Sequence, residues 1–435
     1  MSSSGKLGLL PQHLQNCSGP SVWLEFSPLA QATQSINLGQ GFPDWQPPDF
    51  VTGAASASIS SGHFSQYAKS AGHPHLVNEI ARQYRPRCDE DLDPAKNIIV
   101  TDGASEAIYL ALLSLVEGGD EVIVLEPAFD IYTGAVSMVG GKLVSVPLRT
   151  RRHETSGQLS FYLDIRDLKA KLNQKTKALI LNTPHNPTGK VFSAEEMKEI
   201  GRVICEFPHC TVISDEVYEH LIYDEMEHHS FAAVSGLFSQ TLSIYSAGKT
   251  FSVTGWKIGW VIGPEELINR LQICQQWIVF SVATPLQEAI AVSLKQASKP
   301  YKGYSSYYSW LRIHYQRKRD SFFTSLQECG LNPILPQGTF FILTDVTYHL
   351  QWSDLGDWES YPTFAEKNGV SVDPRTLKLA DYRLCRWLCL EKKVAAIPAS
   401  AFYAPENQHL GERLIRFAFC KDDAVLTEGA RRLSS

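Results

Sequence analysis

Between residues 95 and 265, short apolar runs rich in β-branched residues alternate with longer helix-like stretches. The apolar runs predict β-strands at residues 97–100, 121–126, 142–148, 177–182, 211–214, 242–246 and 259–263. Stretches such as 104–119 and 193–207 lie between them and are typical of helices. This alternation predicts an α/β architecture with a largely parallel sheet. The strands are apolar throughout, which indicates that helices cover both faces of the sheet.

The pattern changes toward both ends of the chain. Residues 312–330 predict a long basic helix followed by shorter α+β segments, and the polar stretch 350–380 predicts an irregular insertion. Residues 39–50 are rich in turn formers and cannot form a regular element. A chain of 435 residues is also too long for one compact core, which usually stops growing at about 250–300 residues. We therefore expect a large domain at 48–310 and a small α+β domain from both chain ends, 1–47 and 311–435.

Composition narrows the choice of partner. Forty basic and 46 acidic residues give a net charge of −6, which favours a small-molecule partner over nucleic acid or an anionic membrane. No apolar run approaches the roughly 18–20 residues that span a bilayer. The N-terminus has no apolar core of signal-peptide type and no arginine, so we expect a cytoplasmic protein, with mitochondria as the alternative location. The sequon Asn16-Cys17-Ser18 is then expected to be unused.

Nine cysteines in a chain of this length are typical of reduced, buried thiols rather than of a disulfide framework. Cys385 and Cys389 lie four residues apart in a helix-like stretch. A metal pair and core packing both fit this spacing, and the lack of a second ligand pair nearby favours packing. We expect no metal site.

Three polar clusters directly follow three of the predicted strands, at residues 182–190, 214–218 and 246–257. In open α/β sheets, ligands gather at the carboxyl ends of the strands. We therefore expect these clusters to converge on one site.

The residue types in the clusters indicate a specific chemistry. Lys249 lies among small residues at a strand end, where desolvation lowers the pKa of an amine and makes it a nucleophile toward an aldehyde. Pyridoxal 5′-phosphate (PLP) carries such an aldehyde, and its ring is an electron sink when the ring nitrogen is protonated. Asp215 is placed to hold that proton by ion pairing, and Tyr218 and Asn186 to hydrogen-bond the ring oxygen.

A phosphate group would find donors in the same region. Ser246 and Lys257 belong to the third cluster, and the backbone N–H groups of Gly103, Ala104 and Ser105 open the helix that follows residues 97–100. Helix N-termini favour anions because of their free N–H groups and their dipole.

The three clusters, NTPHNPTGK, SDEVY and SAGKTFSVTGWK, resemble the signature of the class I and II PLP-dependent aminotransferases of fold type I. The similarity extends from GQGFPDW near residue 40 to RLIRFAFCKDD at 413–423. Within that family, LGQGFPDW, EPAFDIY, PQGTFF and VAAIPASAFY resemble the group of kynurenine aminotransferases and glutamine transaminases K, which also act as cysteine-S-conjugate β-lyases. The resemblance implies a large domain with a mostly parallel sheet and a small α+β domain.

The resemblance also implies roles around the cofactor. Lys249 would bond covalently to PLP as a Schiff base and carry the substrate proton, and Asp215 would pair with the ring nitrogen. Phe129 would stack on the ring, with Asn186 and Tyr218 on the ring oxygen. Tyr67 would reach the phosphate in a neighbouring subunit, which implies a homodimer with shared active sites.

On the substrate side, Arg416 would clamp the carboxylate of an amino acid or a 2-oxo acid as a bidentate fork, which lysine cannot reproduce. A structural salt bridge is the alternative for this arginine, because it lies in an apolar run. The other substrate-side residues that the resemblance implies are Asn182, Gly41, Trp23, Phe280 and Phe340. The implied reaction transfers the amino group of kynurenine, glutamine, or an aromatic or sulfur-containing L-amino acid to a 2-oxo acid.

Two other functional classes fit the sequence less well. Ala247-Gly248-Lys249-Thr250 matches the end of a P-loop, but that motif needs glycine at position 243, which is serine. A regulator that keeps a PLP-binding fold would need a DNA-binding segment, for which the chain has no room. Two alternatives stay open within the resemblance: β-elimination from cysteine S-conjugates to give pyruvate, and an aminotransferase of aspartate or alanine type.

Overall fold

The computed structural model describes residues 11–15, 19–88, 91–154, 157–233, 236–354 and 356–434. The sequon at 16–18 lies outside the described residues. Each of the seven apolar runs forms a strand, and together these strands make one sheet. Their bounds are β2 Ile98–Asp102, β3 Glu121–Glu126, β4 Lys142–Pro147, β7 Thr176–Asn182, β8 Thr211–Asp215, β9 Thr241–Ser246 and β10 Ile258–Ile262.

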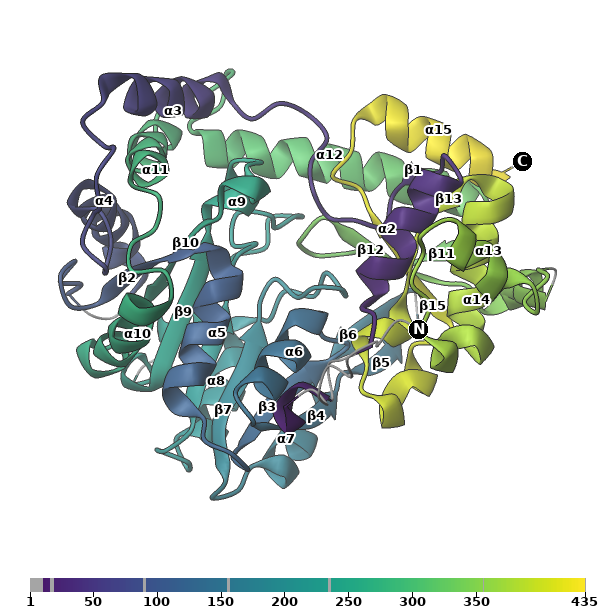
Figure 1. Ribbon diagram of the computed structural model, residues 1–435, viewed down its shortest axis with the longest axis horizontal. Coiled ribbons are helices and arrows are strands. Elements are labelled where there is room, and N and C mark those ends of the chain that lie inside the picture. Colours follow the sequence, from purple (N-terminus) through teal and green to yellow (C-terminus); the bar gives the residue numbers. More distant parts are fainter. Residues whose placement is uncertain are drawn as a thin grey trace, which may run out of the picture.

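The strand order in this central sheet is β2-β10-β9-β8-β7-β3-β4. The strands β9, β8, β7, β3 and β4 pair in parallel, and β10 runs antiparallel to both of its neighbours. Parallel neighbours need a crossover connection, and α8 (Ala194–Ile204) supplies one between β7 and β8. The predicted α/β class with a mostly parallel sheet is confirmed (Figure 1).

Helices cover both faces of the sheet, because successive residues of each strand point to opposite sides. In β3, Val122 and Val124 pack in a cluster with residues of α5, α6 and α10. Ile123 and Leu125 belong instead to the larger core cluster, which contains residues of α4, α8, α11 and α12. This two-sided burial explains why β3 contains a continuous apolar run and not an alternation of apolar and polar residues.

The helices in the first three quarters of the chain follow and accompany this sheet. Besides α8 they are α1 Gln12–Gln15, α2 Val22–Ala32, α3 Asp49–Ser61, α4 Pro74–Tyr84, α5 Gly103–Leu115, α6 Asp130–Met138, α7 Ile165–Lys171, α9 Ala247–Thr250, α10 Glu265–Ile278, α11 Thr284–Ala297 and α12 Tyr307–Glu328. The predicted basic helix at 312–330 corresponds to α12.

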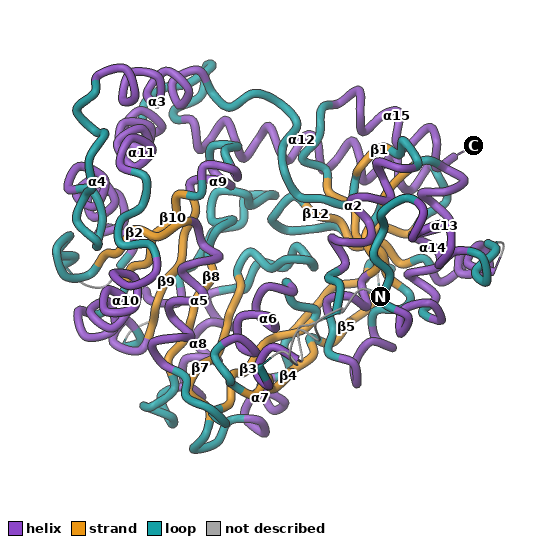
Figure 2. Tube along the Cα trace, in the orientation of Figure 1, coloured by secondary structure: helices purple, strands orange, loops and turns teal. Residues whose placement is uncertain are grey.

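A second, smaller sheet has the order β11-β12-β15-β14, with antiparallel pairing. Its strands are β11 Asn332–Pro333, β12 Phe341–Asp345, β14 Ile397–Pro398 and β15 Leu414–Ala418. Nearby, β1 (Ile36–Asn37) pairs in parallel with β13 (Val394–Ala395), so both chain ends contribute to this part. Glu25 of α2 forms an ion pair with Arg386 of α14 (Ala380–Trp387), and α15 (Asp423–Ser434) contacts α12, which extends from one part to the other (Figures 1 and 2). The domain limits at residues 47 and 310 stay predictions.

Two local features of the structure differ from what the sequence predicted. The 350–380 stretch is not wholly irregular, because it contains α13 (Tyr361–Lys367) and 3-10 turns at Thr347–Asp354 and Pro374–Lys378. The hairpin of β5 (Arg149–Arg152) and β6 (Leu159–Tyr162) was not expected at all. The four residues of β5 are all exposed and polar, so they carry no apolar signal.

No helix in the described parts of the chain is long and apolar enough to cross a membrane. The cytoplasmic location stays a prediction. Cys385 and Cys389 are both fully buried in the core cluster. A search of the described residues finds no group of three or more histidine, cysteine or acidic residues that could hold a metal ion.

Candidate active site

A cavity of about 270 Å³ lies where the central sheet meets the loops that follow its strands. Its lining comes from the ends of β7, β8 and β9, from the N-terminus of α5, and from Arg416 of β15. The candidate residues that line it are Trp23, Gly41, Ala104, Ser105, Phe129, Asn182, Asn186, Asp215, Tyr218, Ser246, Lys249, Lys257 and Arg416. Tyr67, Phe280 and Phe340 are the candidates that do not. The three polar clusters therefore converge, as their places after parallel strands predicted.

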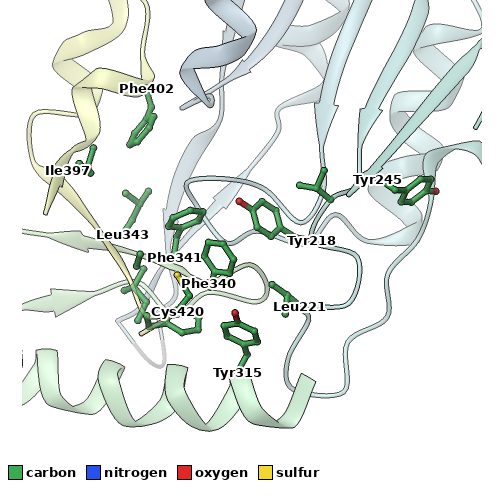
Figure 3. Packing of buried hydrophobic residues seen from close by; sticks show 14 of the residues in the cluster. Tyr218, Leu221, Tyr245, Tyr315, Phe340, Phe341, Leu343, Ile397, Phe402 and Cys420 are labelled. Atoms are coloured by element: carbon green, nitrogen blue, oxygen red, sulfur yellow. The ribbon is translucent and has the colours of Figure 1, made fainter. Parts of the chain in front are cut away.

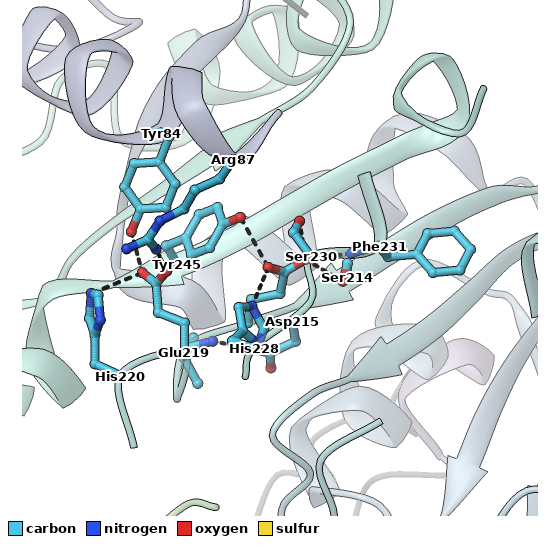
Figure 4. A network of polar contacts seen from close by, with 12 residues as sticks. Tyr84, Arg87, Ser214, Asp215, Glu219, His220, His228, Ser230, Phe231 and Tyr245 are labelled. Carbon is cyan, nitrogen blue, oxygen red and sulfur yellow. Dashed lines mark hydrogen bonds and ion pairs between the residues drawn. The ribbon is translucent and has the colours of Figure 1, made fainter. Parts of the chain in front are cut away.

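A larger cavity, of about 930 Å³, lies beside the loop that follows β8. Figure 4 shows polar side chains along it: Arg87 forms an ion pair with Glu219, and His220 lies 3.5 Å from the same carboxylate. Glu216 accepts a hydrogen bond from His228 at 2.8 Å. These carboxylates are satisfied within the chain and hold the loop in place. The candidate catalytic groups lie around the smaller cavity.

Lys249 stands in the four-residue helix α9, directly after β9. The hydroxyl of Ser246 caps this helix by accepting a hydrogen bond from the Gly248 N–H. The Lys249 Nζ lies 5.6 Å from the ring centroid of Tyr218 and 5.3 Å from that of Phe340. Burial lowers the pKa of Lys249 to about 8, although Asp215 favours the protonated form. The neutral, nucleophilic fraction of this amine at neutral pH is therefore much larger than that of an ordinary exposed lysine.

Asp215 ends β8 and is only 4% exposed. Burial raises the pKa of its carboxyl to about 6, against hydrogen bonds from Tyr132 and from the Val217 N–H. The Tyr132 hydroxyl donates to Asp215 Oδ2 at 2.6 Å, and the Val217 N–H donates to Oδ1 at 3.3 Å. Asp215 therefore keeps a negative charge at neutral pH inside the protein, where a cationic ligand atom would bind it.

The opposite end of the cavity is suited to an anion. The 13-residue helix α5 begins at Gly103, so the N–H groups of its first turn, at Ala104 and Ser105, face the cavity beside Lys257. Gly103 has φ +73°, and a Cβ there would lie 3.0 Å from the Lys257 Nζ. A Cβ at Gly259 would lie 2.7 Å from the Ala104 nitrogen. These glycines let the lysine and the helix N-terminus approach each other, and the resulting donor set fits a phosphate.

Among the residues that the structure describes, Arg416 is a buried cation without a charged partner of its own. Its guanidinium donates to the Asn186 Oδ1 and to the Gly39 carbonyl, both at 2.9 Å, and both acceptors are neutral. Its Nε has no hydrogen-bond partner among the described residues. Burial lowers the pKa of Arg416 to about 10, so the group is still charged at neutral pH. A buried guanidinium of this kind fits an incoming carboxylate better than it fits the structural salt bridge considered above.

Asn182 and Asn186 hold the segment that follows β7 in place at the cavity. The Asn182 Oδ1 accepts from the Asn186 N–H at 2.7 Å, and its Nδ2 donates to the Asp215 carbonyl at 2.9 Å. Its amide therefore holds β7 and β8 in register at the cavity, with one N–H left for a ligand. The Asn186 Oδ1 is taken by Arg416, which leaves its Nδ2 to donate toward the cavity.

An aromatic wall lines the substrate side of the cavity. It contains Trp23, whose Nε1 donates to Asp130 at 2.9 Å, together with Phe129 and Phe341. Phe340 does not line this cavity, because neighbouring residues of an extended segment point to opposite sides, and its expected substrate role stays a prediction. Phe341 faces the cavity, while Phe340 is fully buried behind it against Tyr218, with ring centroids 5.2 Å apart (Figure 3). A Cβ at Gly41 would lie 2.5 Å from the Phe341 ring, so only glycine fits there.

The model of the family "Aminotransferase class I and II" matches residues 33–433. The chain belongs to this aminotransferase family. The match includes every residue that lines the cavity except Trp23, and it extends over both sheets.

Curated relatives cover nearly the whole aminotransferase. Kynurenine–oxoglutarate transaminase of Dictyostelium discoideum is 43% identical over 96% of this chain and 94% of its own. Kynurenine–oxoglutarate transaminase 1 of Homo sapiens is 39% identical over 93% of each chain. Among solved structures, N-succinyldiaminopimelate aminotransferase of Mycobacterium tuberculosis superposes with a TM-score of 0.83 at 36% identity, over 98% of this chain and 99% of its own. These names share the reaction type and differ in substrate.

Two candidates of the aminotransferase lie outside its own cavity. Tyr67 is 82% exposed and Phe280 is 52% exposed, and their rings contact each other at 5.2 Å between centroids. Phe280 lies outside the cavity lining of its own chain, and its expected substrate role stays a prediction. For Tyr67 the position is compatible with the expected reach into a second subunit.

Several residues that line the cavity were not expected from the sequence, among them Tyr132, Phe341 and Gln40. A signal existed for Tyr132, which stands three residues after Phe129 in EPAFDIY and therefore on the same face of the helix that starts there. Gln40 lies in the turn-rich N-terminal segment, where its side chain accepts a hydrogen bond from Asn37. Nothing in that segment distinguishes it from its neighbours.

Proposed function

We propose that this aminotransferase uses PLP to move the amino group of an L-amino acid to a 2-oxo acid. One observation carries the proposal: a neutralisable lysine, a buried carboxylate, a helix N-terminus with Lys257, and a buried arginine whose acceptors in the described structure are neutral all face one cavity. Each group matches one part of the reacting system. Taken alone, none of them would indicate this chemistry.

The residues present fit the cofactor. The N–H groups of Ala104 and Ser105, with Ser246 and Lys257, would hold the phosphate, and Asp215 would pair with the ring nitrogen. Phe129 would lie on the ring face, and the Asn186 Nδ2 and the Tyr218 hydroxyl would donate to the ring oxygen. Burial raises the pKa of Tyr218, so this phenol stays a donor. When bound, PLP supplies an aldehyde for the substrate amine and a ring that withdraws electrons from the substrate Cα.

The side chains of the protein then perform three tasks. Arg416 binds the substrate carboxylate through two N–H groups and so orients the Cα–H bond toward Lys249. The neutral Nζ of Lys249 accepts the proton from Cα and returns it in the second half of the reaction. Phe129, Trp23 and Phe341 exclude water and receive the substrate side chain. Amino acids and oxo acids use the same arginine, because both carry a carboxylate next to the reacting carbon.

For the amino donor we propose kynurenine, glutamine, or an aromatic or sulfur-containing amino acid. The aromatic wall supports flat, apolar side chains. The names of the two curated relatives support kynurenine as donor and 2-oxoglutarate as acceptor. β-Elimination from cysteine S-conjugates remains a prediction, since the same Cα–H cleavage leads to it when Cβ carries a good leaving group.

The cofactor-loaded protein is expected to change from the aldehyde to the amine form when a good donor is added without any oxo acid. The measurement is the visible–ultraviolet spectrum during titration with kynurenine, glutamine, aspartate and a cysteine S-conjugate. Growth of the amine form with kynurenine or glutamine, but weakly with aspartate, supports the proposal. A preference for aspartate favours the other substrate class, and pyruvate from the S-conjugate shows lyase activity. If the purified protein takes up no PLP, the proposal is wrong.

We also propose that the functional unit is a homodimer. Large apolar side chains lie exposed on α10 and in the segment after it: Ile273 is 60% exposed, Trp277 82% and Ile278 48%. Ile273 and Trp277 are four residues apart and so share one helix face. Phe280 is the second residue after this helix, and its ring contacts the exposed ring of Tyr67. We infer that these side chains form one apolar patch, which is typical of an interface.

Trp277→Glu is expected to convert the dimer into monomers, because it places a charge in the centre of this patch. Light scattering after gel filtration at micromolar concentration measures the mass. Tyr348→Glu is the matched control, since Tyr348 is 85% exposed but lies far from the patch in the sequence and is not part of it. A wild-type mass equal to that of one chain, or an unchanged mass in Trp277→Glu, contradicts this interface.

A further inference from the structure

Few groups stabilise the ionised form of the Asp215 carboxyl. It is buried at the end of β8, and no arginine or lysine forms an ion pair with it among the described residues. The charged and titratable groups around it are Lys249 of α9, Glu216 and Tyr218 of its own segment, and Tyr132 of α6. Lys249 favours the ionised form and Glu216 opposes it. The direct contacts on the carboxylate oxygens are the two hydrogen bonds described above.

Of these two hydrogen bonds, the one from Tyr132 is much the better placed. Its oxygen lies 2.6 Å from the Asp215 Oδ2, within the range of strong O–H···O⁻ bonds, whereas the Val217 nitrogen lies 3.3 Å from Oδ1. Tyr132 is itself only 2% exposed, and burial raises its pKa well above the usual value, so the phenol keeps its proton. It donates to Asp215 at any working pH.

The packing of α6 holds Tyr132 in the position from which it donates to Asp215. The residue stands in the first turn of α6, which packs against the same face of the sheet as α5, and its ring contacts Phe129 with centroids 6.0 Å apart. The helix follows β3, and Tyr132 reaches the end of β8, although β7 lies between these two strands in the sheet. Tyr132 also lines the cavity, so it contacts both the carboxylate and the space beside it.

We propose that Tyr132 is a positioning residue that keeps Asp215 ionised and turned toward the ring nitrogen of the bound cofactor. The inference rests on the proposed use of PLP. The phenol stabilises the carboxylate form and holds Oδ2, so that the carboxylate is charged and oriented before the cofactor arrives. Without the phenol, the buried carboxyl retains its proton more readily and rotates more freely.

Tyr132→Phe removes only the hydroxyl and is expected to weaken the binding of pyridoxamine 5′-phosphate about tenfold at pH 6. This ligand has the ring nitrogen and phosphate but no aldehyde, so its binding does not involve bond formation to Lys249. The affinity loss is larger at low pH because the pKa of Asp215 is about 6 in the wild type and rises in the variant. Below pH 6 the loss is full, and above the raised pKa it disappears, since Asp215 is then ionised in both proteins.

The measurement is the dissociation constant of pyridoxamine 5′-phosphate, from tryptophan fluorescence of the cofactor-free protein at pH values from 6 to 9. At each pH, the dissociation constant of the variant is divided by that of the wild type. Because the ligand is the same in both titrations, this ratio reports only the difference between the two proteins. Tyr361→Phe is the matched control: this buried tyrosine also donates to a carboxylate, Glu25, at 3.1 Å, but in the part of the chain around α13. It is expected to leave the ratio at one.

A second pair of variants separates this role from simple packing. In an Asp215→Asn background, Tyr132→Phe is expected to have no pH-dependent effect, because the group that titrates is gone. A pH-independent loss of affinity in both backgrounds would overturn the proposal and assign Tyr132 to packing alone, as would an unchanged affinity at pH 6. If the wild-type protein binds neither PLP nor pyridoxamine 5′-phosphate, the proposed function fails instead, which is a distinguishable result.

Discussion

Replacing Lys249 with alanine is expected to reduce transamination by at least about a thousandfold. The variant loses the only amine in the cavity whose pKa is lowered by burial toward neutrality, among the residues that the structure describes. It thereby loses the proton acceptor and donor for the substrate Cα. Lys257, the other lysine of the cavity, stands beside Gly103 at the helix N-terminus and not beside Tyr218, so it cannot take over this task.

The same variant is expected to remain folded. The Ser246 cap and the buried neighbours Ala247 and Gly248 hold α9, and the Lys249 side chain contributes only its contacts with two rings. Steady-state turnover and thermal unfolding by circular dichroism measure the two effects separately. Lys299→Ala, an exposed lysine that hydrogen-bonds Gln296, is the control and should behave as the wild type. Activity near the wild-type level in Lys249→Ala would refute the mechanism.

Arg416→Lys is expected to raise the KM values for the amino acid and for the oxo acid together, each about a hundredfold. A lysine keeps the charge but offers a point donor in place of the planar fork that meets a carboxylate through two parallel bonds. The change also keeps a donor for the Asn186 amide or the Gly39 carbonyl, both of which an alanine would leave unsatisfied. The lysine variant is therefore the better test of the clamp.

Initial rates at varied concentrations of both substrates give the two KM values. Arg413→Lys, on the exposed approach to the same strand, is the matched control and should change neither. A rise in only one KM would mean that the two substrates do not share the arginine. If neither KM value changes, Arg416 has a structural role, in which it only holds the Asn186 side chain and the Gly39 carbonyl.

Much of the fold was predictable because burial on both faces leaves a direct trace in a strand. The runs 121–126 and 177–182 each contain four consecutive apolar residues, and both became interior strands of the sheet. The hairpin of β5 and β6 left no such trace, since an exposed strand of arginines is held by pairing with its neighbour and not by its own composition. The pairing of β1 with β13 joins residues more than 350 positions apart, and two-residue strands carry no periodicity.

The place of the site, and most of its residues, followed from the sequence for a topological reason. Clusters that end parallel strands must meet at one edge of the sheet. The sequence alone therefore predicted that Asn186, Asp215 and Lys249 lie close together. Which side chain touches which was a different matter. Phe340 and Phe341 are identical in type and adjacent in sequence, and only the path of the chain near β12 turns Phe341 to the cavity and buries Phe340.

What the sequence by itself determined is the order of strands and helices and the set of reactive groups, because hydrophobic periodicity and strand ends are local properties. The tertiary structure alone decided the electrostatics of those groups. Asp215 carries its charge beside Tyr132, and Arg416 lies among neutral acceptors, because segments far apart in the chain exclude water there and supply only these partners. Desolvation depends on everything that packs around a group, and no local stretch of sequence contains that information.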